Sequence, residues 1–142
     1  MSKSNSLETS LLGLLFNATA IANIADNAAS SPLTALYVSL HTADPGEGGN
    51  QTTNEAAYTS YARVAVNRNS GGWTVSGNSV SPVATISFPA ATGGGETETH
   101  FGIGTASSGA GVLLYSGAIS PTIGVSNGVT PQLTTASTIT ED

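Results

Sequence analysis

The spacing of apolar residues changes once along this chain. Up to about residue 26 they recur every three or four positions, which is the period of a helix. From Leu33 onward they alternate with polar residues, which is the period of a strand. Pro32 disfavours helix at the residue before it, so the change falls at this point. The pattern predicts an N-terminal helical arm over residues 1–32 and a β domain over residues 33–142.

A single helix is predicted over residues 6–26. Ser6 is its expected N-cap, and Glu8 lies in the first turn, where the helix dipole favours an acid. The apolar run 11–16 is shorter than the ~7–15-residue core typical of a signal peptide and follows Glu8, so an amphipathic helix is the better interpretation. The apolar positions at helical spacing are Leu7, Leu11, Leu14, Leu15, Ala18, Ile21, Ala22 and Ala25. This wide stripe either covers one end of the β domain or binds another subunit.

The remainder predicts an antiparallel β-sandwich or jelly-roll-like fold of about seven short strands. The segment 69–72 is expected to close a hairpin between two of them, and Pro131 fits an edge strand better than a central one. The long polar segment 42–59 is rich in turn-forming residues and is predicted to be a loop. The expected strands cover residues 33–41, 61–67, 73–75, 83–88, 97–105, 112–119 and 129–140.

Charge is scarce and unevenly placed. The 142 residues include 3 Lys and Arg against 9 Asp and Glu, a net charge of −6, and no cation follows Arg68. Binding to nucleic acid needs clustered cations, and an acidic surface repels anionic lipid as well, so neither partner is expected. No apolar run approaches the ~20 residues of a transmembrane helix. Long charged side chains are depleted at interfaces, so the composition suits a subunit packed into an assembly.

Candidate metal ligands are few. His41 and His100 are the only histidines, and with Asp44 they match no zinc motif. We expect both imidazoles to be satisfied by local hydrogen bonds at strand ends. Asp44 and Glu47 leave calcium open as an alternative, although their loop lacks the order of ligands of an EF-hand. Neither a metal nor a cofactor is predicted.

Candidate catalytic groups are equally few. Glu96 and Glu98 would face the same side of a strand, which suits a glycosidase only if the sheet forms a deep cleft. After three glycines, a solvated strand start is the more natural interpretation. The G-x-S-x-G elbow of serine hydrolases is absent. The glycines at 102 and 104 lack a nucleotide-binding context and are expected to permit close strand approach or a bulge. The chain is predicted not to be an enzyme.

An ordered series of motifs resembles a known family. The motifs are LYVSLHTADPG at 36–46, YARVAV at 61–66, ISFPAATG at 86–93, THFGI at 99–103 and LLYSG at 113–117. In this order they resemble small virion structural proteins of tailed bacteriophages, which are labelled as tail-fibre or capsid decoration (cement) proteins. The resemblance covers roughly residues 11–140. It implies a β-sandwich subunit that works in a phage particle after synthesis in the host cytoplasm.

Three functions remain open within this framework. The favoured one is a capsid decoration protein on the capsid surface, a homotrimer that binds and stabilises the shell of major capsid protein. The second is a tail, neck or fibre component that binds a receptor or glycan through aromatic residues, and the third is a small hydrolase that uses Glu96 and Glu98. The aromatic candidates are Tyr37, Tyr58, Tyr61, Trp73 and Tyr115. The candidate partner contacts are Leu11, Leu15, Asp44, Glu47, Arg63 and Arg68.

Overall fold

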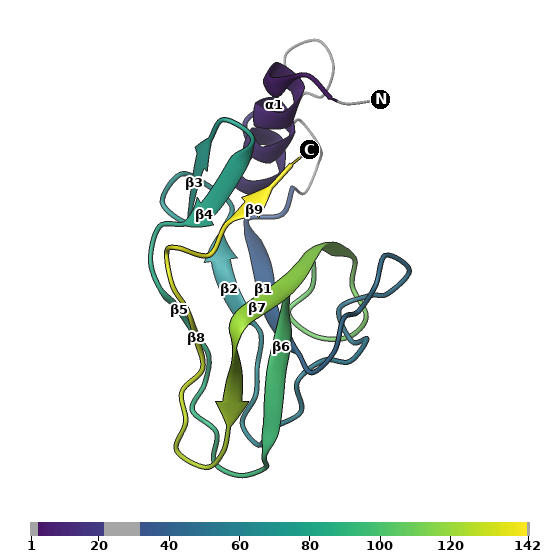
Figure 1. The fold of residues 1–142 in the computed structure, drawn as a ribbon. Helices are drawn as coiled ribbons and strands as arrows, with labels where there is room; N and C mark the ends of the chain where they lie inside the picture. The colour runs from purple at the N-terminus through teal and green to yellow at the C-terminus, as the bar shows by residue number, and fades with distance from the viewer. Residues whose placement is uncertain (1–2, 22–31, 142) are drawn as a thin grey trace. The chain divides into compact units, whose positions relative to one another are not determined.

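A computed structural model describes residues 3–21 and 32–141 of the chain. It is mainly β, with antiparallel sheets and one helix near the N-terminus (Figure 1), and this confirms the predicted fold class. No helix in these two ranges is long and apolar enough to cross a membrane. The elements are α1 Asn5–Asn17, β1 Ala35–His41, β2 Val64–Asn67, β3 Trp73–Ser76, β4 Ser79–Pro82, β5 Ile86–Ser87, β6 Glu96–Gly104, β7 Leu113–Val125, β8 Gln132–Leu133 and β9 Ile139–Thr140.

The strands form three sheets, and the chain divides into two compact units. The sheets have the strand orders β2-β1-β6-β7, β3-β4-β9 and β5-β8. Unit 1 consists of Met1–Ala35, Val66–Thr85 and Leu133–Asp142, and unit 2 consists of Leu36–Ala65 and Ile86–Gln132. Each unit therefore combines segments that are far apart in the sequence.

In unit 1 the helix is shorter than predicted. Ser4, not Ser6, is the N-cap, and its side chain accepts a hydrogen bond from the amide of Leu7. The helix ends at Asn17 because the next residue, Ala18, adopts a left-handed φ of 53°. The prediction of helix is therefore wrong for residues 18–21, and residues 22–26 lie outside the described ranges. Glu8 occupies the first turn as expected.

Arg68 stabilises this early end of the helix. Its Nε donates to the carbonyl oxygen of Leu15 at 2.6 Å, and its Nη2 donates to that of Leu14 at 2.5 Å. A third bond runs from Nη1 to the oxygen of Leu33 at 3.2 Å. The last carbonyls of a helix lack partners within the helix and carry its negative partial charge, so a guanidinium there satisfies both needs.

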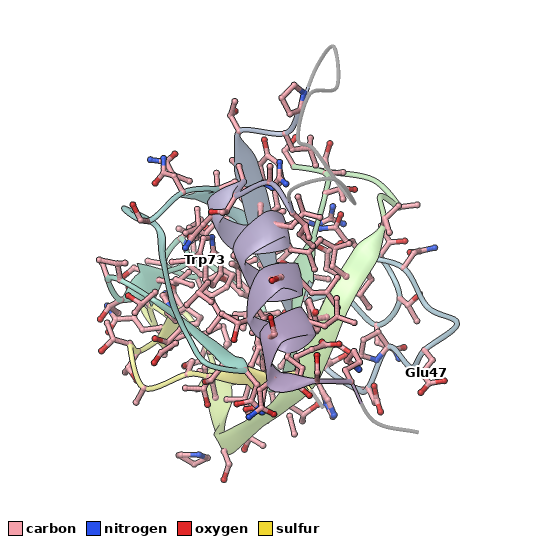
Figure 2. All side chains as sticks on the ribbon, turned by 90° about the horizontal axis from the view of Figure 1, so that it is seen from above. Glu47 and Trp73 are labelled. Carbon is pink, nitrogen blue, oxygen red and sulfur yellow. The ribbon has the colours of Figure 1, made fainter. Side chains whose placement is uncertain are left out.

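The buried face of the helix differs from the predicted stripe. Its buried residues are Glu8, Leu12 and Phe16 at four-residue spacing, whereas Leu11 and Leu15 are only partly buried. The ring of Phe16 packs edge-on against Trp73 of β3, with centroids 4.8 Å apart. Trp73 is labelled in Figure 2. A helix that is apolar over most of its circumference leaves the choice of face to its tertiary contacts. The helix thus packs on strands of its own chain.

The three-stranded sheet of unit 1 contains a hairpin that the sequence analysis misplaces. β3 and β4 pair in antiparallel register from Trp73↔Pro82 to Ser76↔Ser79, and Gly77 turns the chain with a φ of 61°. Residues 69–72 do form a turn, in which the amide of Gly72 donates to the oxygen of Asn69 at 2.9 Å. The predicted hairpin across this turn is nevertheless wrong, because β2 belongs to the four-stranded sheet and β3 does not.

In unit 2, β6 lies between β1 and β7 and pairs with both of them in antiparallel register. It pairs with β1 from Tyr37↔Gly104 to His41↔His100, and with β7 from Glu96↔Val125 to Gly104↔Leu113. The register with β7 shifts twice, between Glu98 and His100 and again beside Gly104. Of the other predicted strands, 83–88 shrinks to β5, 112–119 extends to the full length of β7, and 129–140 splits into β8 and β9.

Candidate functional site

The loop that follows β1 is anchored by buried polar side chains of unit 2. His41 is fully buried; its Nδ1 lies 2.9 Å from the carbonyl oxygen of Thr53, and its Nε2 lies 2.8 Å from Oγ of Ser39. A carbonyl only accepts, so Nδ1 carries the proton and the Ser39 hydroxyl donates to Nε2. Burial lowers the pKa of His41, which keeps the ring neutral. Nδ1 of His100 lies 2.9 Å from Oγ1 of Thr99. Local hydrogen bonds therefore satisfy both ring nitrogens of His41, as predicted, and one ring nitrogen of His100.

Two glycines of β6 leave room for this loop. A Cβ atom on Gly102 would lie 2.7 Å from Nε2 of His41, and one on Gly104 would lie 2.1 Å from Cδ of Gln51. Gln51 is buried, and its Oε1 accepts from the amide of Ala106 at 2.9 Å. The amide of Gln51 donates in turn to the oxygen of Ala110 at 2.9 Å. Close approach is confirmed at both glycines, and the register with β7 shifts beside Gly104.

We call Glu55, Arg63, Ala106 and Gly109 the arginine clamp. Nε and Nη2 of Arg63 donate to the two carboxylate oxygens of Glu55 at 2.6 and 2.8 Å. Nη1 donates to the oxygen of Ala106 at 2.8 Å, and Nη2 also donates to that of Gly109 at 2.7 Å. Only 2% of the Arg63 side chain is exposed. A bidentate ion pair of this kind holds the loop after β1, which carries Glu55, to the loop between β6 and β7, which carries Ala106 and Gly109. The two loops lie side by side in Figure 1.

Tyr61 extends the clamp towards β1. Its hydroxyl donates to Oε1 of Glu55 at 3.0 Å and accepts from the amide of Leu40 at 3.1 Å. Burial raises the pKa of Tyr61, so the phenol stays protonated and keeps its donor. The Tyr61 ring packs edge-on against Tyr58 and stacks on Phe88, at centroid distances of 5.3 and 6.4 Å. These aromatic residues contribute to the packing of unit 2.

We call Glu96 and Glu98 the carboxyl pair. Oε1 of Glu96 accepts from the amides of Ala57 and Tyr58 at 2.8 and 2.7 Å. Glu98 is fully buried, and neither of its carboxyl oxygens has a hydrogen-bond partner in the described residues. Burial first, and then the neighbouring Glu96, raises the pKa of Glu98 to about 8. Glu98 therefore carries a proton at neutral pH, and a protonated carboxyl beside Glu96 is itself a donor.

The carboxyl pair corrects one prediction. A solvated strand start is wrong for Glu98, because the loop that carries Ala57 and Tyr58 covers this end of β6. Burial raises the pKa of Tyr58 to about 12, and the charges of Glu98 and Glu96 add to this shift. Neither carboxyl lines the two pockets described next. Glu98 thus lies in the interior of unit 2, and Glu96 is partly buried.

An open pocket of about 490 Å³ is lined by Asp44, Glu47 and His100, three residues that the sequence analysis weighed as candidate metal ligands. Asp44 and Glu47 come from the loop after β1, and His100 comes from β6. Both acids are exposed, and Glu47 projects from its loop in Figure 2. The rest of the wall consists of Gly46, Gly49 and residues 113–117 of β7. Within residues 3–21 and 32–141, no group of three or more His, Asp or Glu side chains could hold a metal ion.

A smaller pocket of about 270 Å³ borders the arginine clamp. It is lined by Glu55, Tyr61, Ala62, Arg63 and residues 107–109. The ionic groups in its wall, Glu55 and Arg63, already bond to each other, so few of their donors and acceptors remain for a ligand. Of the five predicted aromatic residues, Tyr115 lines the larger pocket, whereas Tyr58 and Trp73 are buried. The larger pocket is therefore the better candidate site.

The chain matches a family of phage virion structural proteins. The model of the family described as podophage GP4 fiber I protein gp80 matches residues 2–140, and the chain belongs to this family. No curated protein sequence matches the chain. The family match confirms the resemblance to virion structural proteins of tailed bacteriophages, and its description is that of a fibre protein.

Proposed function

We propose that the chain is a fibre component of a podophage virion. The observation that carries this proposal is the family match, which spans residues 2–140 and names a fibre protein. A match of this extent covers both compact units, so it applies to the whole arrangement of sheets and helix and not to one shared motif. The predicted decoration of a capsid shell remains the alternative within the same class of virion proteins.

The placement of the charged groups supports a structural role. Each of the three Lys and Arg side chains has a partner within the chain: Lys3 pairs with Glu141, Arg63 with Glu55, and Arg68 with the helix carbonyls. Of the carboxyls that a hydrolase would use, Glu98 is buried in the interior of unit 2, and Glu96 accepts hydrogen bonds from two backbone amides. Charges placed in this way stabilise a subunit, so we propose that the chain has no catalytic activity.

The location in the particle is tested by cryo-electron microscopy of purified virions, combined with quantitative mass spectrometry. A fibre component is expected as density on the tail or its neck, at a copy number far below that of the major capsid protein. Density at regular positions over the shell, with a copy number comparable to that of the capsid protein, would instead support decoration. Light scattering on the isolated chain tests the predicted trimer in either case.

Contacts with the major capsid protein, and roles in partner binding for Leu11, Leu15, Asp44, Glu47, Arg63 and Arg68, stay predictions. The structure gives the two arginines intramolecular bonds, which already account for their positions. Asp44 and Glu47 are exposed and line the larger pocket, so they are the strongest candidates in this set.

A further inference from the structure

Glu98 lies in a part of unit 2 that offers no counter-ion for its carboxylate. The residue is fully buried, and neither carboxyl oxygen has a partner among the described residues. β7 carries one titratable residue, Tyr115, at the far end of its ladder with β6, and the ladder with β1 begins only at His100. Among the described residues, the titratable groups that interact with Glu98 are therefore Glu96 on its own strand and Tyr58 on the loop after β1.

The loop segment 57–60 is fastened to one neighbouring stretch of the chain, residues 89–96. Hydrogen bonds of 2.7–3.1 Å join the two stretches. They run from the amides of Ala57 and Tyr58 to Oε1 of Glu96, from the amide of Thr59 to the oxygen of Gly93, from the amide of Thr92 to the oxygen of Thr59, and from the hydroxyl of Tyr58 to the oxygen of Pro89. None of these bonds belongs to the ladders of β6 with β1 or β7, so the segment can detach without breaking either ladder.

The arginine clamp fixes the chain on both sides of this segment. Glu55 precedes it and Arg63 follows it, and the two side chains are joined by their ion pair. Within the segment, Ser60 has a φ of 80°, a left-handed conformation that strains the backbone of residues other than glycine. Short segments of low stability can open while the rest of a fold stays intact. An opening of this segment is therefore confined to the few residues between the two anchors.

We propose that loss of the proton from Glu98 opens the segment 57–60 and admits water to the carboxyl pair, while the strands of unit 2 stay paired. A charged carboxylate without a counter-ion is costly in a dry interior, and the neighbouring Glu96 adds repulsion between like charges. Opening hydrates Glu98 and removes this cost. The inference concerns unit 2 alone, so it holds for a fibre and for a decoration protein alike and stands apart from the proposed location in the particle.

The opening should depend on pH in one direction. The pKa of Glu98 is about 8 in the closed state, whereas a hydrated glutamic acid has a pKa of ~4.3. The closed state therefore holds one more proton between these values. Its advantage over the open state is complete below ~4.3 and is lost as pH rises through about 8. The equilibrium constant for opening should rise by up to about tenfold per pH unit in this interval and then level off. Tyr58 stays neutral here, because its pKa is about 12.

Amide hydrogen exchange of the full-length chain, followed by NMR from about pH 5 to about pH 8, measures this opening. Dividing the intrinsic rate of an unstructured peptide by each observed rate at the same pH gives a protection factor. The protection factor of the Thr59 amide should fall by up to about tenfold per pH unit. The amide of Gln51, which donates to the oxygen of Ala110 in the same unit, is the reference and should stay better protected. Carbon-13 NMR should show the carboxyl of Glu98 titrating near pH 8.

Charge variants identify the responsible group. Glu98→Gln has no proton to release, so the protection factor of Thr59 should become independent of pH. Glu141→Gln removes a carboxylate in unit 1 and should leave the pH dependence unchanged. An unchanged pH dependence in Glu98→Gln, or none in the wild type, would overturn the proposal. Equal protection factors for Thr59 and Gln51 at every pH would mean that the whole unit unfolds, which also overturns a local opening. If Glu98→Gln does not fold, the carbon-13 titration decides, because a Glu98 that titrates near ~4.3 has no proton to lose in this range.

Discussion

Two acids of unit 2, the partly buried Glu55 and the fully buried Glu98, are neutralised in different ways. In the arginine clamp, Glu55 is matched by the guanidinium of Arg63, which donates to both of its oxygens. In the carboxyl pair, Glu98 has no cation among its described partners and is neutral because it carries a proton. A guanidinium stays charged throughout the accessible pH range, whereas a proton is lost as pH rises. The guanidinium of the clamp should therefore keep its charge as pH rises, whereas the carboxyl pair should lower the stability of the fold in alkali.

The largest expected effect comes from breaking the clamp. Arg63→Met should destabilise the fold by about 3–5 kcal/mol, because it leaves Glu55 charged and without its cation in a largely buried place. Two carbonyl oxygens, of Ala106 and Gly109, lose donors as well. Urea denaturation followed by tryptophan fluorescence measures the change.

A matched control separates charge from geometry. Arg63→Lys keeps the charge but loses the planar fork, so it should restore part of the stability and not all of it. The double variant Arg63→Met with Glu55→Gln removes both charges and should be less destabilised than Arg63→Met alone. If the double variant is as unstable as the sum of the two single variants, the ion pair is not the source of the effect.

The second effect concerns the carboxyl pair and depends on pH. The pKa of Glu98 is about 8 in the folded chain and ~4.3 in an unfolded one, so the folded state holds one more proton between these values. Unfolding stability should then fall as pH rises through this interval, by a few kcal/mol in total, and level off above about pH 8.

Glu98→Gln tests this assignment directly. Glutamine has nearly the same shape and cannot ionise, so the variant should match the wild type near pH 5 and exceed its stability near pH 8. Denaturation midpoints across this range give the comparison. Arg63→Lys serves as the reference, because its loss of stability should be the same at both pH values. An unchanged slope in Glu98→Gln would assign the pH dependence to another group.

This contrast between two buried acids lies beyond what the sequence predicts. The strands β1 and β6, the existence of a helix and the close packing at Gly102 and Gly104 follow from local patterns and are confirmed. The environment of Glu98 does not, because it depends on a distant loop whose residues Ala57 and Tyr58 bond to the neighbouring Glu96 from 38–39 positions away. Local spacing in the sequence does not distinguish the buried Glu98 from the exposed acids Asp44 and Glu47.

The helix and the hairpin show the same limit in unit 1. The helix stops at Asn17 although Ala18 continues the apolar stripe, and the bonds from Arg68 to the last carbonyls involve a residue 53 positions away. The turn at 69–72 was a correct local prediction, yet its flanking strands join different sheets. Strand pairing is a long-range choice, whereas turn chemistry is local.

A smaller effect tests the packing that supports the clamp. Gly104→Ala should cost about 1–3 kcal/mol, because the added Cβ meets the side chain of Gln51 at 2.1 Å. Gln51→Ala in the same chain should relieve the clash, so the double variant should be more stable than the two losses added together. Gly48→Ala, whose Cβ would meet no atom within 4 Å, is the control and should leave the denaturation midpoint unchanged.

The smallest expected loss of stability comes from changing Arg68, whose charge is paired with the carbonyl oxygens at the end of the helix. Arg68 is matched by helix carbonyls and not by a carboxylate, and it is only partly buried. Arg68→Gln should therefore cost about 1–2 kcal/mol, less than Arg63→Met, because no charged partner is left behind. Arg68→Lys should recover part of the loss through its charge. Equal losses at the two arginines would mean that donor count, and not the stranded carboxylate, decides what each arginine contributes.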